Sequence, residues 1–265
     1  MKNAIFNRAR RLLGEENMLR LEDARVIIFG VGGVGSWCAE SLIRSGVGHL
    51  TIVDSDRVCI TNINRQLMAN TTTVGRVKVE ALKEHLLKIN PTAEIETRQE
   101  IYCADTADSF DLDSYDYVVD AIDSLKDKVL LIERATASKA RFFSSMGAAL
   151  KMDPTRIKVA EFWKVIGCPL ARALRQRFKK TKRFPKKKFL CVYSDELLEN
   201  KGIETSCDSE YCVCKSKNTP GNHDPANHDW NASKAQINGS LQHITAIFGM
   251  TIAGLIIKDI TGRNF

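Results

Sequence analysis

The chain has 265 residues, of which 44% are hydrophobic, so it can bury one sizeable core. No stretch approaches the roughly 20 apolar residues of a membrane span, and the basic segment 1–11 lacks the apolar run of a secretory signal. We therefore expect a cytoplasmic protein without a membrane partner, whose eight cysteines are reduced thiols.

Strand and helix patterns alternate over the first half of the chain, after a segment at 8–21 that is predicted to be helical. Short β-branched and apolar runs predict strands at 26–29, 50–53, 93–97, 117–120 and 141–145. Apolar residues on a helical period predict helices at 36–45, 76–89 and 125–139. This order predicts a Rossmann-like α/β fold, with a largely parallel sheet and helices on both faces.

The rest of the chain is predicted to complete a single domain. We divide the whole chain into three parts. They are an α/β core at 1–160, a basic, cysteine-containing and partly irregular substrate-side segment at 161–235, and a C-terminal apolar helix within 236–265. The most apolar stretch, from Ala246 to Ile257, favours a helix of the core or of a dimer interface.

A glycine-rich loop, with Gly30, Gly32, Gly33 and Gly35, follows the first predicted strand. Glycines let the backbone turn tightly and approach a phosphate, and the free N–H groups of the following helix attract its negative charge. The spacing also fits a dinucleotide site, in which Asp54 at the end of the next strand holds a ribose hydroxyl. The loop alone therefore leaves a dehydrogenase open.

Charged residues after Asp54 favour ATP over a dinucleotide. Arg65 and Lys78 supply the extra cations that a triphosphate needs when its phosphorus is attacked. Asp123 follows the fourth predicted strand, and a carboxylate at the carboxyl end of a parallel strand is suitably placed to bind magnesium. The set predicts an ATP and Mg²⁺ site in the core at 1–160.

From Gly30 to Asp123, the motifs resemble in order and spacing those of the adenylating family that includes ThiF, MoeB and the ubiquitin-activating enzymes. The resemblance implies that Asn62 lines the cleft near the reacting phosphate and that Asp120 supports Asp123. It implies a nucleotide-binding set of Gly30, Gly32, Gly33, Gly35, Asp54, Asp56, Arg65, Gln66, Lys78, Asp120 and Asp123. It implies catalytic roles for Arg11, Asn62, Arg65, Lys78 and Asp123.

The same resemblance implies a homodimer with shared active sites. In this family an arginine near the N-terminus of one subunit reaches into the site of its partner. Arg11 fits this role best, and Arg8 and Arg10 are the alternatives.

A basic segment stands apart from the nucleotide motifs. Ten of the seventeen residues from Arg172 to Lys188 are Lys or Arg and none is acidic, and without them the chain carries a net charge of −3. The ten are Arg172, Arg175, Arg177, Lys179, Lys180, Lys182, Arg183, Lys186, Lys187 and Lys188. We expect Phe178, Phe184 and Phe189, which lie among them, to stack on exposed bases. An isolated run of this kind is usually a solvated helix face, but beside an adenylating site it favours tRNA as the partner.

Further motifs at 153–157 (Asp-Pro-Thr-Arg-Ile) and 191–194 (Cys-Val-Tyr-Ser) resemble one branch of the family, the tRNA threonylcarbamoyladenosine dehydratases. This resemblance implies an ATP-dependent cyclising dehydration of threonylcarbamoyladenosine in the tRNA anticodon loop, through an acyl-adenylate of the threonyl carboxylate. The alternative is an adenylyltransferase that activates the C-terminus of a ubiquitin-like sulfur carrier, which has no need of the basic segment. A nucleotide-binding module without chemistry is disfavoured by the intact Arg65, Lys78 and Asp123.

The cysteines leave two further hypotheses open. Cys191 matches a family position, so a thiol relay with a sulfur-transfer protein is conceivable, although a packing role is favoured. A second group contains three thiols and two nearby imidazoles, without the paired C-x-x-C of a structural zinc site. It consists of Cys207, Cys212, Cys214, His223 and His228. Zinc binding there is an alternative to a mobile loop near the substrate.

Overall fold

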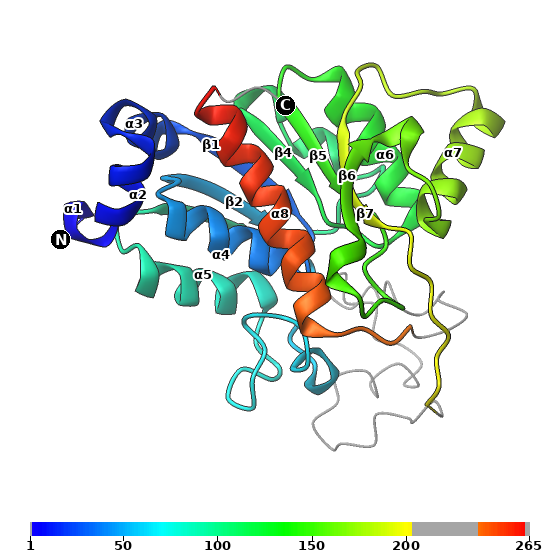
Figure 1. Ribbon diagram of the computed structural model, residues 1–265, viewed down its shortest axis with the longest axis horizontal. Coiled ribbons are helices and arrows are strands. Elements are labelled where there is room, and N and C mark those ends of the chain that lie inside the picture. The colour runs from blue at the N-terminus through cyan, green and yellow to red at the C-terminus, as the bar shows by residue number, and fades with distance from the viewer. Residues whose placement is uncertain (1, 203–237, 263–265) are drawn as a thin grey trace.

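The computed structural model describes residues 2–202 and 238–262 (Figure 1). Within them, a seven-stranded sheet has the order β3-β2-β1-β4-β5-β7-β6. Neighbouring strands run parallel except for β6, which pairs antiparallel to β7. The strands are β1 (Arg25–Phe29), β2 (His49–Val53), β3 (Glu94–Arg98), β4 (Tyr117–Asp120), β5 (Arg141–Ser145), β6 (Ile157–Glu161) and β7 (Leu190–Ser194).

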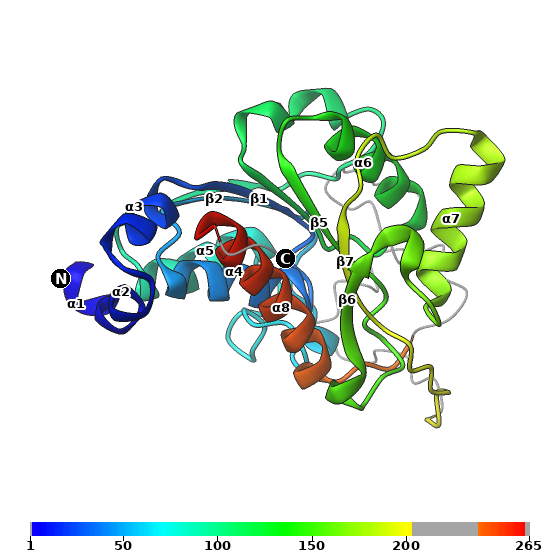
Figure 2. The ribbon, with the colours of Figure 1, turned by 45° about the horizontal axis from the view of Figure 1, so that its top comes forward.

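Helices cover both faces of the sheet (Figure 2). One face is covered by α4 (Gly35–Ser45), α5 (Lys78–Ile89) and α8 (Gln242–Ile260), and the other by α6 (Leu125–Ala137) and α7 (Pro169–Thr181). Before β1 the chain forms α1 (Lys2–Ile5), α2 (Asn7–Leu13) and α3 (Glu15–Asp23). Short 3-10 helices occupy Ile60–Asn62, Ala107–Ser109, Leu112–Ser114, Pro154–Arg156 and Phe162–Lys164.

Strand β1 lies at the centre of this arrangement because both of its faces are apolar. Val26 and Ile28 pack into the core beneath α4 and α8, whereas Ile27 and Phe29 pack into the core beneath α6 and α7. All four side chains are fully buried. A continuous apolar run of this kind is typical of a parallel strand with helices on both faces.

The predicted Rossmann-like fold is confirmed, with two differences in its elements. The predicted N-terminal helix is broken at Gly14, whose φ of 82° is left-handed, so that α2 and α3 form instead. From residue 161 onward, where sequence analysis predicts a partly irregular segment, α7 and β7 are regular, and the boundary after residue 160 falls inside β6. The edge strand β6 is largely solvent-accessible and lacks the apolar run by which a strand is recognised.

Helix α8 confirms the predicted C-terminal apolar helix. Among the described helices it alone is long and apolar enough to cross a membrane by length and composition, which corrects the expectation that no stretch approaches that size. Ile244, Phe248, Ile252 and Ile256 are nevertheless fully buried against α4 and the sheet. This core position accounts for the composition of the helix.

The contact between α8 and α4 depends on the absence of a side chain at Gly249. A Cβ there would lie 2.3 Å from the carbonyl oxygen of Val34 and 2.8 Å from the amide nitrogen of Cys38. Both atoms belong to the backbone and have no rotamer to change, so the helices would have to separate.

We expect Gly249→Ala to lower the free energy of unfolding by about 1–3 kcal/mol. Gly254 on the same helix has no atom within 4 Å of its Cβ position, so Gly254→Ala should raise stability by up to about 1 kcal/mol through helix propensity. Urea unfolding of both variants measures the difference. Equal effects would contradict the steric argument.

Candidate active site

The predicted nucleotide residues gather where β1, β2 and β4 end. Helices α4 and α5 follow β1 and β2 on one face of the sheet, whereas α6 follows β4 on the other face. The loops after β1 and β4 therefore diverge and leave a crevice at the carboxyl ends of the strands, which is where open α/β sheets bind their ligands.

Close packing fixes two glycines of the loop after β1. Gly30 has a φ of 85°, and a Cβ there would lie 2.8 Å from the carbonyl oxygen of Ala121, just beyond β4. A Cβ on Gly35 would lie 1.9 Å from the carbonyl oxygen of Gly30. Glycine at position 30 lets the loop press against the exit of β4, and glycine at position 35 lets α4 begin against the carbonyl of Gly30.

The other two glycines lie in more open surroundings. A Cβ on Gly33 would touch the side chain of Thr245 on α8 at 3.2 Å, and one on Gly32 would meet only Nε2 of Gln66, at 3.7 Å. No side chain among the described residues caps the beginning of α4. The helix end therefore remains suited to an anion, although the amide of Ser36 already donates to the carbonyl oxygen of Gly32 at 3.2 Å.

The sequence after β2 brings two aspartates and a lysine together. Oδ2 of Asp54 accepts a hydrogen bond from the amide of Val31 in the glycine loop, at 2.9 Å. Nζ of Lys78, at the start of α5, lies 2.6 Å from Oδ2 of Asp56 and 3.8 Å from Oδ1 of Asp54. The side chain of Lys78 is almost fully buried.

These contacts set the charges of Asp54 and Lys78. Burial raises the pKa of Asp54 above its ordinary value, against the attraction of Lys78. Burial lowers the pKa of Lys78, but the charges of Asp54 and Asp56 outweigh it, so that this pKa lies above its ordinary value. Lys78 is therefore a cation at neutral pH and is held by its own carboxylates.

Arg65 lies in the loop after the 3-10 helix at Ile60–Asn62. Its Nη1 donates to the carbonyl oxygen of Thr61 at 2.9 Å and to Oδ1 of Asn64 at 3.0 Å. Burial lowers the pKa of Arg65, and the charge of Asp123 opposes this shift. Asp123 also raises the pKa of Lys78. The structure thus brings Arg65, Lys78 and the exposed Asp123 within electrostatic range of one another.

Asn62 and Gln66 shape the same loop. Oδ1 of Asn62 accepts from the amide of Cys59 at 3.0 Å, which closes the turn. Gln66 is buried, and its Oε1 lacks a hydrogen-bond partner among the described residues. Trp37 of α4, which sequence analysis did not single out, donates through Nε1 to the carbonyl oxygen of Arg65 at 3.0 Å. This bond ties the Arg65 loop to the helix that follows the glycines.

The carboxylate of Asp120 is fully buried and supports the turn that carries Asp123. Its Oδ2 lies 2.8 Å from Nζ of Lys128 and accepts a hydrogen bond from Ser144 at 2.6 Å. Nζ of Lys128 also donates to the carbonyl oxygen of Ile122 at 2.8 Å. Burial raises the pKa of Asp120, and Lys128 opposes the shift. Sequence analysis missed Lys128, whose signal is a lysine among the apolar positions of the predicted helix.

The N-terminal arginines lie far from the glycines of their own chain. Phe6 and Met18, which flank α2, pack beside Gly46 at the end of α4, whereas the glycine loop is at its beginning. An 11-residue helix separates the two places by about 16 Å. Arg10 is paired with Glu15, and Arg8 and Arg11 are exposed.

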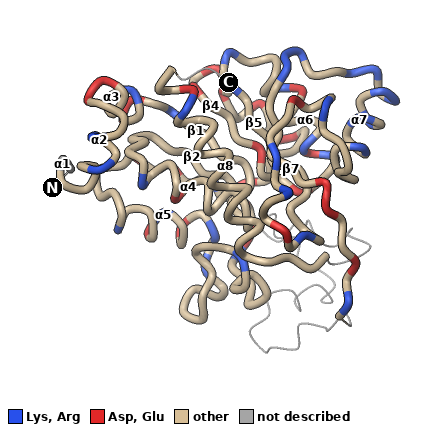
Figure 3. The backbone as a smooth tube through the Cα atoms, viewed as in Figure 1, with Lys and Arg blue, Asp and Glu red and all other residues tan. Residues whose placement is uncertain are grey.

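The basic segment lies mostly beside the amino ends of the parallel strands, at the opposite end of the strands from the crevice. Helix α7 runs away from the carboxyl ends of the strands, and residues 182–189 then lead into the amino end of β7 (Figure 3). Three of its cations have partners within the chain. They are Arg175, which donates to two carbonyl oxygens, Arg183, which pairs with Glu133, and Lys187, which donates to Ser138. The exposed others are Arg172, Arg177, Lys179, Lys180, Lys182, Lys186 and Lys188.

The expectation that three phenylalanines of this segment stack on bases is wrong for two of them. Phe178 and Phe189 are buried in the core beneath α6 and α7. Phe178 follows Leu174 and Ala171 on the apolar stripe of an amphipathic helix, and Phe189 enters the sheet just before β7. Phe184 alone of the three is exposed.

Cys191 is fully buried on β7, and burial raises the pKa of its thiol well above the ordinary value. The thiolate is the reactive form, so this environment favours packing over sulfur relay. The predicted zinc-binding group at 207–228 lies outside the described residues. Within the described ranges, no three His, Cys, Asp or Glu side chains gather as metal ligands.

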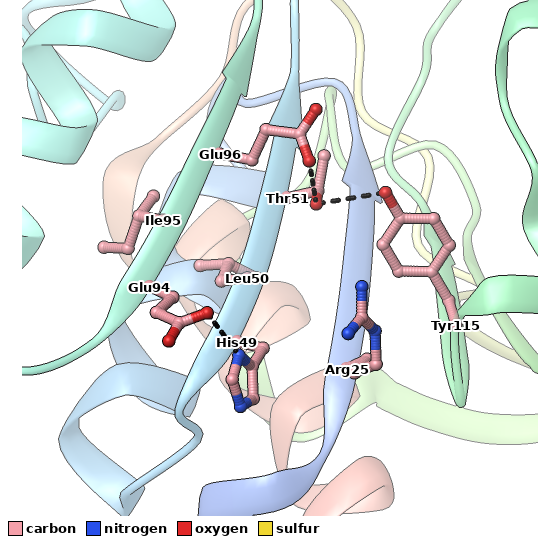
Figure 4. Close-up of a pocket in the computed structure, with 8 residues that line it drawn as sticks. All are labelled: Arg25, His49, Leu50, Thr51, Glu94, Ile95, Glu96 and Tyr115. Carbon is pink, nitrogen blue, oxygen red and sulfur yellow. Dashed lines mark hydrogen bonds and ion pairs between the residues drawn. The ribbon is translucent and has the colours of Figure 1, made fainter.

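A hollow of about 340 Å³ lies away from this crevice, near the beginnings of β1, β2 and β3 (Figure 4). Four of its polar side chains bond to one another in pairs. Nδ1 of His49 lies 3.0 Å from Glu94, and the hydroxyl of Tyr115 donates to Thr51 at 3.1 Å. None of the predicted site residues lines it.

We expect Lys128→Met to lower the free energy of unfolding by about 3–5 kcal/mol, because it leaves the Asp120 carboxylate buried without its cation. Adding Asp120→Asn should restore a large part of the loss, since the buried charge is then removed. Chemical denaturation of the single and double variants forms the cycle. Additive losses would show that the two residues act independently.

Comparison with known proteins places this site in a family. The ThiF family model matches residues 6–265. The tRNA threonylcarbamoyladenosine dehydratase of Bacillus subtilis is 40% identical over 72% of this chain and 74% of its own length. Adenylyltransferase and sulfurtransferase MOCS3 of Culex quinquefasciatus is 35% identical over 53% of this chain and 32% of its own. The crystal structure of E. coli tRNA N6-threonylcarbamoyladenosine dehydratase, TcdA, in complex with ATP has a TM-score of 0.80 at 30% identity, covering 98% of this chain and 95% of that one. This chain therefore belongs to the ThiF family.

Proposed function

We propose that this protein catalyses the ATP-dependent, cyclising dehydration of threonylcarbamoyladenosine in tRNA. The observation that carries the proposal is the likeness, over 98% of the chain, to the E. coli dehydratase whose structure contains ATP. The convergence of the glycine loop, Arg65, Lys78 and Asp123 in one crevice supports it.

The described residues fit ATP. Gly32 leaves room beside the N-terminus of α4 for a phosphate group. Gln66 places its Nε2 beside Gly32, where this amide group can donate a hydrogen bond to a phosphate oxygen. Asp54 accepts bonds from Val31 and Asp56, but a carboxylate has about four acceptor positions, so it can still bind a ribose hydroxyl.

Magnesium fits as well, since it is often held by one or two carboxylates together with substrate phosphates and water. Asp123 would supply the carboxylate, since it is exposed at the carboxyl end of β4 and accessible to such an ion. The ion would neutralise part of the charge of the phosphates.

The reaction has two steps. The threonyl carboxylate attacks the α-phosphate of ATP, the bond to the β-phosphate oxygen breaks, and pyrophosphate leaves with an acyl-adenylate behind it. Arg65 and Lys78 stabilise the developing negative charge. The neighbouring ureido group then attacks the acyl carbon, loses its proton and expels AMP, which carries away one carboxylate oxygen. The nucleoside has lost the elements of water, and a tethered nucleophile makes an enzyme thiol unnecessary.

The proposal includes a cytoplasmic homodimer. Arg11 is exposed at the far end of α4 from its own glycine loop, so it can serve an active site only in a partner subunit. Arg8 shares this exposure, whereas Arg10 is paired with Glu15.

The basic segment is proposed to bind tRNA away from the reacting nucleotide. Helix α7 has 13 residues and spans about 20 Å, so its last turn is far from the carboxyl ends of the parallel strands. Cations there contribute phosphate contacts and affinity, and the chemistry remains with the crevice.

Purified protein incubated with ATP, Mg²⁺ and tRNA that bears threonylcarbamoyladenosine should yield a nucleoside lighter by one water in mass spectrometry of the digest. Asp123→Asn should reduce the rate at least about 100-fold through lost electrostatic stabilisation, and Asp105→Asn, at an exposed turn after β3, should not. If ATP-binding protein forms no such product but adenylates a ubiquitin-like sulfur carrier, the alternative function replaces this one.

The tRNA contacts have a separate test. Lys179→Gln/Lys180→Gln should weaken tRNA binding and reduce the slope of log K against log salt by about one to two, because two phosphate contacts are lost. The rate at saturating tRNA should not change. The double variant Lys83→Gln/Lys88→Gln on α5 removes the same charge elsewhere. If both double variants weaken tRNA binding equally, the basic segment contributes only through the net charge of the protein.

A further inference from the structure

Two large aromatic side chains lie exposed beside each other near the amino ends of the strands, whereas the active site lies at the carboxyl ends. Trp163, in the 3-10 helix after β6, is 40% exposed, and Phe184, between α7 and β7, is 46% exposed. Their ring centroids are 6.1 Å apart and their planes form an angle of 44°. Adjacent aromatic groups left in water are a feature of interaction surfaces.

The core beneath holds this pair in place. Trp163 packs edge-on against the fully buried Phe162, with 5.2 Å between the ring centroids. Phe162 in turn stacks on Phe189 at 5.0 Å. The amide of Trp163 donates to Glu161 at 3.0 Å, which fixes the turn. Trp163 is therefore already ordered and Phe184 packs against it, so a ligand would meet a small entropic cost on binding.

The surroundings of the pair are cationic. Lys164 follows Trp163, and Lys182 and Lys186 lie on either side of Phe184 in the chain; all three are exposed. Figure 3 shows Lys and Arg along α7 and the loop after it. Aromatic faces among cations suit an unpaired nucleotide, whose base stacks while its phosphates are neutralised.

We propose that Trp163 and Phe184 form a stacking platform for an unpaired base of RNA, with Lys164, Lys182 and Lys186 at the flanking phosphates. The proposal rests on the proposed function in taking tRNA as that RNA. Because the platform lies at the amino ends of the strands, the base that it holds is not the one that is modified.

Trp163→Ala and Phe184→Ala should each weaken binding of a tRNA transcript about tenfold, as expected for the loss of one stacked base. Trp163→Phe should retain most of the affinity. Ile166 lies three residues further on and is 66% exposed, but it has no aromatic face, so Ile166→Ala should bind as the parent does. Unfolding midpoints of the variants establish that the fold is intact.

Tryptophan fluorescence gives a second measurement. A short single-stranded oligoadenylate should quench the emission of the parent protein, and Trp163→Phe should abolish the quenching. A blunt RNA duplex should not quench, because it offers no unpaired base. Unchanged tRNA affinity in both alanine variants overturns the platform. A loss of affinity in Ile166→Ala as large as theirs also overturns it, and indicates an apolar protein-docking surface.

These outcomes are independent of the dehydration assay, since the transcript carries no modified nucleoside. A dehydrated product formed by a protein whose alanine variants bind tRNA normally would leave the function standing and remove the platform. If the protein forms no dehydrated product but its alanine variants bind tRNA more weakly, the platform stands and the proposed function is removed.

Discussion

The buried ion pair between Asp120 and Lys128 is the interaction on which the geometry of the crevice depends. It joins the last residue of β4 to the helix that leaves on the opposite face from α4, and it reaches the turn that carries Asp123 through the carbonyl of Ile122. The glycine loop presses against the same turn at Ala121. The two diverging loops are thereby held at a fixed separation, within which the charges of the site converge.

Sequence reasoning predicted the fold and the residues of the crevice because their causes are local. Gly30 is required where the loop passes close to the neighbouring strand, and Gly35 where the loop turns back against its own backbone. These needs appear in the sequence as a fixed spacing. Lys128 escaped notice because a lysine in a helix is usually solvated, and its burial is decided by a carboxylate on another element. The phenylalanines of the basic segment were misjudged for a related reason. Whether Phe178 faces solvent or core depends on the orientation of α7, which a run of cations conceals.

The molecule keeps two groups of cations at opposite ends of its strands. At the carboxyl ends of the strands, cations are partly buried and matched with carboxylates, as a reacting phosphate requires. Most cations of the basic segment are exposed, and among the described residues only three of them have partners, namely Arg175, Arg183 and Lys187.

The pairing of Lys78 with Asp54 and Asp56 has a consequence for ligand selection. A phosphate group must compete with two carboxylates for this ammonium before it gains the full attraction of the site. A ligand that draws Lys78 away leaves Asp54 and Asp56 without their cation, so its binding costs part of the attraction that already exists within the chain. The ammonium of Lys78 is therefore already neutralised within the chain, which weakens the attraction of the crevice for small anions.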